Sequence, residues 1–294
     1  MLLTGNVIRK ELGLIGGNWM NQKNEWSTVQ SAERMNIERH FEYDNYAMDM
    51  FRKWMPFLLK PSLKMMEVGS GGGFFTNLLL TINPQMNLTC LEPDPELAGN
   101  LASRFEDRVS VLPSRVEQIP MKSSVYDVVL SHIVLHNLNN PLAALDEMTR
   151  VTKAGGHVVA IEPLPASRHY FPTPELQQAF DLLQKAQVYR CMEWSSTREV
   201  ASPRDPWSYC YPQLFEQVAL KDIHCFGWTS VFTLSDSRFS FTDRKRWAGR
   251  RAKLIENEQS STSEILKRNG HTQNEIDQAS SIIHSYCERV DRIS

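Results

Sequence analysis

The sequence of 294 residues lacks long hydrophobic runs, paired cysteines and an excess of charge of either sign. Its five cysteines are widely spaced and form no Cys-x-x-Cys pair, which argues against a disulfide framework or a zinc site. The weaker alternative is that Cys191, Cys210 and Cys225 gather around a soft metal; we expect no metal. A formal net charge of −2 gives no support for a nucleic-acid or membrane-surface partner, and we expect neither. Because no apolar run could span a bilayer and no signal-peptide layout is present, a cytoplasmic protein is expected.

The sequence does contain a glycine-rich stretch between two apolar segments, Gly-Ser-Gly-Gly-Gly at residues 69–73. Residues 63–68 are a short apolar run typical of a buried strand, and residues 74–82 have helical periodicity. A strand, a glycine turn and a helix open a nucleotide-binding βαβ unit, in which glycines let backbone N–H groups approach a ligand. The dinucleotide fingerprint requires a glycine at position 74, where Phe74 stands.

A second apolar segment, residues 88–92, is predicted to be a strand that ends in Glu92. This acid lies about twenty residues beyond the glycines, where a carboxylate can accept hydrogen bonds from both hydroxyls of a ribose. The combination of this acid with the glycine turn therefore predicts a nucleoside-binding site.

The pattern Glu-x-Gly-x-Gly-x-Gly, which starts at Glu67, resembles motif I of the class I S-adenosylmethionine (SAM)-dependent methyltransferases. In that family the motif cradles the amino-acid end of SAM, and the acid helps to receive its ammonium group. Further family-like motifs follow in order: an acidic-loop ending at Ile119-Pro120, a Tyr-Asp strand from Tyr126, and a Lys-Ala-Gly-Gly turn from Lys153 into a fifth strand. The resemblance covers roughly residues 63–234, apart from the loosely patterned residues 164–212.

The resemblance implies an α/β fold, the doubly wound, seven-stranded class I methyltransferase sheet with its last strand antiparallel. We expect residues 1–60 to form an N-terminal helical cap and residues 61–240 to form the core, closed by strands at 221–228 and 231–234. Residues 164–212, with a helix at 174–190, are expected to form a lid insertion, or alternatively a dimer interface. Residues 241–294 are expected to form two C-terminal helices around Asn269-Gly270.

Cofactor recognition is expected to follow the family with one departure. Where the family's acidic loop usually has an Asp that receives the adenine amino group, this chain has Arg115, which cannot accept a hydrogen bond. Adenine recognition is then expected to fall to backbone atoms, to Glu117 or to stacking on the arginine plane. The resemblance implies the following cofactor-binding residues: Glu67, Gly69, Ser70, Gly71, Gly73, Glu92, Pro93, Val116, Glu117, Ser131 and His132.

Candidates for catalysis and substrate binding come from aromatic and histidine side chains. Tyr43 and Tyr46 could reach the site, since aromatic faces and hydroxyls stabilise an electron-poor sulfonium methyl, or they could simply pack the N-terminal segment. His132 and His136 follow the fourth strand and are either general bases or hydrogen-bonded structural residues. The weak catalytic candidates are His132, His136 and Tyr46, and the substrate candidates are Tyr43, Tyr46, His136, Tyr170 and Trp207.

The resemblance implies transfer of a methyl group from SAM to a small-molecule acceptor by SN2 displacement, mainly through positioning in a closed site. A base is not required for an acceptor that is already a thiolate or an amine. A SAM-binding regulatory or non-catalytic protein and non-methyl SAM chemistry are the alternatives. A nucleic-acid methyltransferase is not expected, because no Asn/Asp-Pro-Pro-Tyr loop follows the fourth strand. A monomer or a homodimer is expected.

Overall fold

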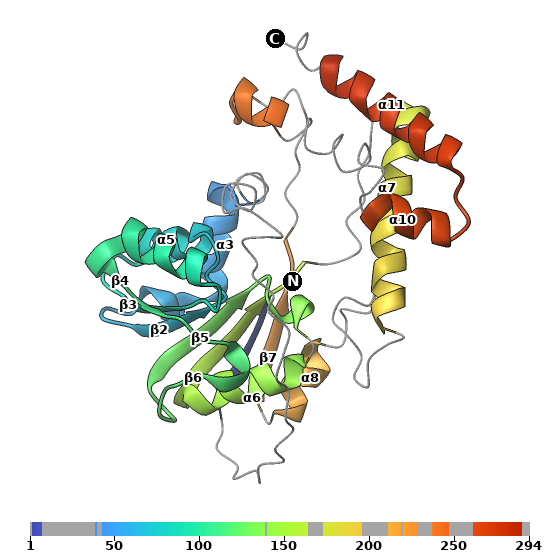
Figure 1. Ribbon diagram of the computed structural model, residues 1–294. Helices are drawn as coiled ribbons and strands as arrows, with labels where there is room; N and C mark the ends of the chain where they lie inside the picture. Colours follow the sequence, from blue (N-terminus) through green and yellow to red (C-terminus); the bar gives the residue numbers. More distant parts are fainter. Residues whose placement is uncertain are drawn as a thin grey trace. The chain divides into compact units, whose positions relative to one another are not determined.

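The computed structural model describes residues 2–7, 39, 43–138, 140–163, 173–195, 211–218, 220–228, 237–246 and 261–289. The chain divides into two units. The first comprises Met1–Pro163 and Tyr209–Ser230, and the second comprises Leu164–Ser208 and Val231–Ser294 (Figure 1). Each unit has its own buried core, and the two are described separately.

Five parallel strands form the centre of the first unit. They are β2 (Lys64–Val68), β3 (Asn87–Leu91), β4 (Val109–Leu112), β5 (Tyr126–His132) and β6 (Thr152–Ile161). Their spatial order is β4-β3-β2-β5-β6, so the direction of chain progression reverses between β2 and β5. Ligands of open α/β sheets bind outside the carboxyl ends of strands at such a reversal. The predicted α/β fold with a parallel sheet is confirmed.

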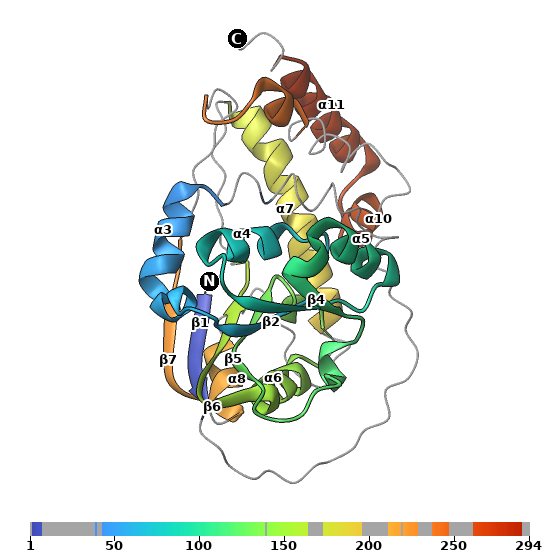
Figure 2. The same ribbon diagram turned by 90° about the vertical axis from the view of Figure 1, so that its left-hand side faces the viewer.

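An N-terminal strand, β1 (Leu2–Val7), extends this sheet. It lies between β6 and β7 (Leu220–Phe226) and is antiparallel to both (Figure 2). The expectation that residues 1–60 are helical was therefore wrong for residues 2–7, since these residues pair with strands more than 150 positions away. The strand expected at residues 231–234 lies outside the described residues.

A bulge interrupts β6 where the sequence predicts a Gly-Gly turn before the strand. Tyr126 pairs with Thr152 and Val128 with His157, so β6 contains three more residues than β5 between these pairs. Gly156 accommodates the close approach, because a Cβ there would lie 2.7 Å from the carbonyl oxygen of Asp127. The strand thus begins before the glycines rather than after them.

Helices cover both faces of the sheet (Figure 2). One face is covered by α3 (Asn45–Trp54), the 3-10 turn η1 (Pro56–Leu59), α4 (Phe74–Ile82) and α5 (Pro95–Phe105). The other is covered by α6 (Pro141–Val151), α8 (Tyr211–Gln217) and the short turns η3 (Val116–Gln118) and η4 (Leu135–Asn137). A further 3-10 turn, η2 (Glu106–Arg108), follows α5.

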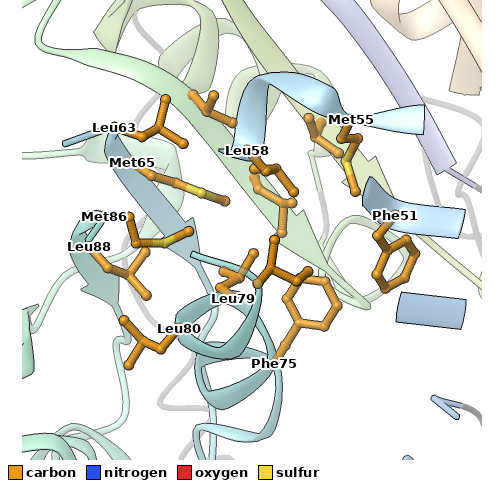
Figure 3. Close-up of a cluster of buried hydrophobic side chains, with 14 of the residues drawn as sticks. Phe51, Met55, Leu58, Leu63, Met65, Phe75, Leu79, Leu80, Met86 and Leu88 are labelled. Carbon is orange, nitrogen blue, oxygen red and sulfur yellow. The ribbon is translucent and has the colours of Figure 1, made fainter. Parts of the chain in front are cut away.

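Two hydrophobic clusters fill the layers, because neighbouring residues of each strand point to opposite faces. Met65 lies in the first cluster and Met66 in the second, and both side chains are fully buried. Figure 3 shows the first cluster, in which Phe51 and Leu58 from the N-terminal elements meet Phe75 and Leu79 of α4. α3 is therefore part of the core next to the glycine loop.

The second unit contains α7 (Pro174–Ser195), α10 (Ser261–Arg268) and α11 (Gln273–Arg289). Apolar residues of the three helices form one buried cluster, in which Ile265, Leu266 and Ile283 have almost no exposed surface. Gly270, with φ of 89°, makes the turn between α10 and α11, as the sequence predicts. None of the helices in the described ranges is long and apolar enough to cross a membrane.

Candidate functional site

The loop between β2 and α4 depends on glycine at three positions. Gly69, Gly71 and Gly73 have φ of 67°, 52° and 76°, in the left-handed region that L side chains rarely adopt. Gly73 caps α4, and its N–H donates to the carbonyl of Ser70 at 3.0 Å. A Cβ on Gly69 would lie 2.5 Å from a methyl of Val134. The glycine loop is therefore pressed against the segment that follows β5.

Glu67 is the buried acid of this loop. It precedes the last residue of β2, and its Oε2 accepts a hydrogen bond from the hydroxyl of Thr76 in α4 at 2.6 Å. Burial raises the pKa of Glu67 to about 7, against the opposing effect of hydrogen bonds from Thr76 and Ser70. A cationic ligand group at this position would favour the charged form.

Glu92 lies at the carboxyl end of β3 and connects that strand to the glycine loop. Its Oε2 accepts from the backbone N–H of Gly71 at 2.8 Å, and its Oε1 accepts from the N–H of Asp94 at 3.0 Å. Burial raises the pKa of Glu92, and these backbone hydrogen bonds oppose the shift. Because a carboxylate offers about four acceptor positions, Glu92 has capacity left for two hydroxyl groups. Pro93 is partly buried beside it.

Two buried polar residues end β5. The hydroxyl of Ser131 is buried and has no hydrogen-bond partner within the described parts of the chain. The ring of His132 stacks on Phe75 with centroids 4.3 Å apart, and its Nε2 lies 2.5 Å from the hydroxyl of Tyr43. Burial lowers the pKa of His132 well below its usual value of 6.5, so the ring is neutral at neutral pH.

The backbone is strained at the residue that directly follows β5. Ile133 has φ of 57°, which is a genuine outlier for a β-branched residue. Its N–H donates to the carbonyl of Ile161 at 2.8 Å, so pairing with β6 extends through this position. Such strain persists only where the surroundings hold it, and it concentrates at functional sites.

Glu162 organises the loop after β5. Its Oε1 accepts from the N–H groups of Val134 and Leu135 at 3.1 and 2.8 Å, and its Oε2 lies 2.7 Å from Nδ1 of His136. The carboxylate is buried, while the His136 side chain is 18% exposed. Glu162 is not among the residues that the sequence motifs indicate. The signal was nevertheless present, because Glu162 follows an apolar strand in the same way as Glu92 does.

The segment expected to face adenine lies in and beside η3. Val116 is buried, and Arg115 is paired with Glu117 at 3.6 Å with more than half of its side chain exposed. Arg115, which departs from the family pattern, is thus paired with Glu117, the acid in this segment that we expect to contact adenine.

The remaining candidates are placed as follows. Tyr43 is buried and packs against His132, Phe74 and Phe75, whereas Tyr46 is 60% exposed on α3. Tyr170 and Trp207 lie outside the described residues. Cys90 is buried and Cys225 is exposed, and both are free thiols. Within the described ranges no group of three or more His, Cys, Asp or Glu side chains is arranged to hold a metal ion.

Comparison with known proteins agrees with this geometry. Residues 66–160 match the sequence family described as "Methyltransferase domain". Over these residues the chain is similar to the class I, SAM-dependent methyltransferases. This match runs from β2 to β6 and so contains the glycine loop, Glu92 and the end of β5. The methyl donor of this family is SAM.

Curated relatives of this chain include three proteins named as methyltransferases. The ubiquinone/menaquinone biosynthesis C-methyltransferase UbiE of Burkholderia cenocepacia is 30% identical over 142 residues, which is 45% of this chain and 56% of that protein. An uncharacterised methyltransferase of Schizosaccharomyces pombe is 27% identical over 44% of this chain and 49% of its own. A malonyl-[acyl-carrier protein] O-methyltransferase of Paenibacillus is 29% identical over 33% of this chain and 37% of its own. The chain spans about half the length of the first two relatives.

Solved structures of similar proteins include a putative methyltransferase from an antibiotic biosynthesis pathway of Anabaena variabilis. It is 13% identical, with a TM-score of 0.49, over 83% of this chain and 85% of that one. A SAM-dependent methyltransferase from Aquifex aeolicus is 20% identical, with a TM-score of 0.42, over 63% of this chain and 86% of that one.

Proposed function

We propose that this chain transfers the methyl group of SAM to a small-molecule acceptor. The observation that carries the proposal is the arrangement around the glycine loop. Three left-handed glycines lie at the carboxyl end of β2, with buried Glu67 and Glu92 at the ends of two neighbouring parallel strands. The unpartnered hydroxyl of Ser131 on the other side of β2 adds a hydrogen-bonding group with capacity for a ligand.

These residues fit the chemical parts of SAM. Glu67, Gly69, Ser70, Gly71 and Gly73 would hold the amino-acid end, where the carboxylate of Glu67 faces the ammonium group. Glu92, with Pro93 beside it, would accept hydrogen bonds from the ribose hydroxyls. Val116 and Glu117 would contact the adenine, and Ser131 and His132 would lie near the methionine part.

The acceptor and the organisation of the whole protein are also part of this proposal. Support for a small-molecule acceptor comes from relatives whose names specify a C-methyltransferase of quinone biosynthesis and an O-methyltransferase of a malonyl carrier. We take residues 164–212 as the lid insertion of the methyltransferase core, with C-terminal helices at 241–294 and a closing antiparallel strand. The chain would act in the cytoplasm as a monomer or homodimer without a nucleic-acid or membrane partner, for which its net charge of −2 gives no support.

The test is calorimetric titration of SAM into the wild-type chain and into Glu92→Gln. The amide keeps one acceptor oxygen but replaces the other with a donor, so one ribose hydroxyl and one of the backbone N–H groups of Gly71 and Asp94 lose their acceptor. We expect one-site binding that weakens about 10- to 100-fold in the variant, as for the loss of a hydrogen bond to a charged group. Glu216→Gln, an exposed acid on α8, is the matched control and should bind like the wild type.

Binding alone does not establish methyl transfer, so release of S-adenosylhomocysteine is measured with a panel of acceptors. A folded wild type that fails to bind SAM would contradict the proposal at the level of the cofactor. Binding with formation of another product from SAM would contradict it at the level of the reaction.

A further inference from the structure

One histidine, His132, ends β5 and a second, His136, lies in η4 after it, and only one of them has a ring nitrogen available to a ligand. The Nε2 of His132 is engaged by the hydroxyl of Tyr43, and its ring is buried and stacked on Phe75. His136 is partly exposed, and only its Nδ1 is engaged within the described residues. The Nε2 of His136 is therefore the imidazole nitrogen that remains available to a ligand.

Glu162 fixes which nitrogen of His136 carries the hydrogen. The backbone N–H groups of Val134 and Leu135 can only donate, so Oε1 of Glu162 accepts from both. An ionised carboxylate is an acceptor at both oxygens, so the nitrogen that faces Oε2 must donate. That nitrogen is Nδ1 of His136, at 2.7 Å. In the neutral ring Nε2 then has a free lone pair, which is the form that a general base needs.

The position of His136 and Glu162 favours a role in the candidate active site, in addition to any role in stabilising the sheet. Glu162 directly follows β6 and His136 lies in η4, so both stand at the carboxyl ends of neighbouring parallel strands. Val134, which Glu162 holds through its N–H, packs against the position of Gly69 in the glycine loop. The pair is thus connected to the loop that we assign to the methyl donor.

We propose that His136 is the general base of this methyltransferase, that Glu162 positions it, and that the acceptor carries a phenolic or enolic hydroxyl. The inference rests on the proposed function. The O–H bond of the acceptor breaks and its proton moves to Nε2 of His136. The resulting anion forms the bond to the methyl carbon, at oxygen or at an adjacent ring or enol carbon, and the electron pair of the broken C–S bond stays on sulfur.

A phenolic or enolic acceptor is favoured because a general base increases the rate most for an acceptor that is protonated at neutral pH. A thiol is partly ionised at neutral pH and its thiolate is intrinsically very nucleophilic, so a positioned base contributes little. A phenol, with a pKa near 10, is almost fully protonated at neutral pH but within reach of an imidazole base. General-base catalysis of such a step contributes about 10²- to 10⁴-fold.

The first arm of the test is the tautomer of His136, read by 15N NMR of the imidazole rings in the 294-residue chain saturated with S-adenosylhomocysteine. The wild type should show hydrogen on Nδ1 and a bare Nε2. In Glu162→Gln the amide oxygen must face the two backbone donors, so its NH2 group faces Nδ1, which then has to accept. The hydrogen of His136 should therefore move to Nε2. A wild type with hydrogen on Nε2 would overturn the proposal.

The second arm is turnover of catechol and of 2-mercaptoethanol, scored as S-adenosylhomocysteine release. His136→Gln and Glu162→Gln should each lower the rate with catechol about 100-fold or more, while SAM binding measured by calorimetry stays within about 3-fold of wild type. His224→Gln, an exposed histidine on β7, is the control and should leave the rate unchanged. A wild type that methylates the thiol but not catechol, or variants that retain the catechol rate, would overturn the proposal. If the wild type does not bind SAM, the result would instead contradict the proposed function itself.

Discussion

At the scale of the residue, Glu67 is an acid kept partly protonated by its surroundings. Its pKa is raised to about 7 from an ordinary value of 4.5, because burial disfavours the charged form. The folded state therefore binds more protons than the unfolded state between these two pH values, and its stability falls as pH rises from about 4.5 to about 7. The shift corresponds to roughly 3 kcal/mol.

This gives a measurable difference between wild type and Glu67→Gln in the absence of SAM. Urea unfolding at pH 5 and pH 7.5 should show the wild type losing about 2 kcal/mol more than the variant, because this interval covers most of the titration and glutamine does not titrate. Glu216→Gln, whose side chain is exposed, should follow the wild type at both pH values. Equal pH dependence of wild type and Glu67→Gln would show that the buried carboxyl does not carry the proton.

At the scale of the element, the loops after β2 and β5 are packed together through Gly69 and Val134. In Gly69→Ala the new Cβ would meet the Val134 methyl at 2.5 Å, in addition to the cost of a left-handed alanine at φ of 67°. Gly155→Ala is a matched control, since Gly155 has φ of 74° but nothing within 4 Å of the added Cβ.

We expect Gly155→Ala to lose about 1 kcal/mol of unfolding free energy from backbone strain alone, and Gly69→Ala to lose about 1–3 kcal/mol more from overpacking. Adding Val134→Ala to Gly69→Ala should recover part of the second loss. The measurement is urea unfolding of the four variants, including Val134→Ala alone. Equal losses for the two alanine variants would mean that the loops are not in close contact.

Some of the helices and strands could be predicted from the sequence and others could not. The strands β2, β3 and β5 and the helices α4 and α6 come from local periodicity, so their apolar patterns indicated them correctly. β1 was missed because its residues, Leu-Leu-Thr-Gly-Asn-Val, carry no strong local signal and its partners are distant in the chain. At the site, glycines and strand-end acids were recognisable, whereas the link between Glu162 and His136 depends on which strands lie side by side.

At the scale of the whole molecule, the two units have separate buried clusters. The sheet packs on two clusters within the first unit, and α7, α10 and α11 share a third within the second. Every described residue that we assign to the methyl donor belongs to the first unit. SAM binding should therefore stabilise the first unit selectively, by about 2.7 kcal/mol at a concentration 100 times the Kd.

Scanning calorimetry should then resolve two transitions, of which only one moves to higher temperature with SAM. A pair of core truncations assigns them. Leu145→Ala in α6 should lower only the SAM-responsive transition, and Ile283→Ala in α11 only the other, because both side chains are fully buried but in different clusters. Each truncation is expected to cost about 2–5 kcal/mol in its own unit. If Ile283→Ala lowers both transitions equally, the chain unfolds as one cooperative body and the stabilities of the two units are not independent.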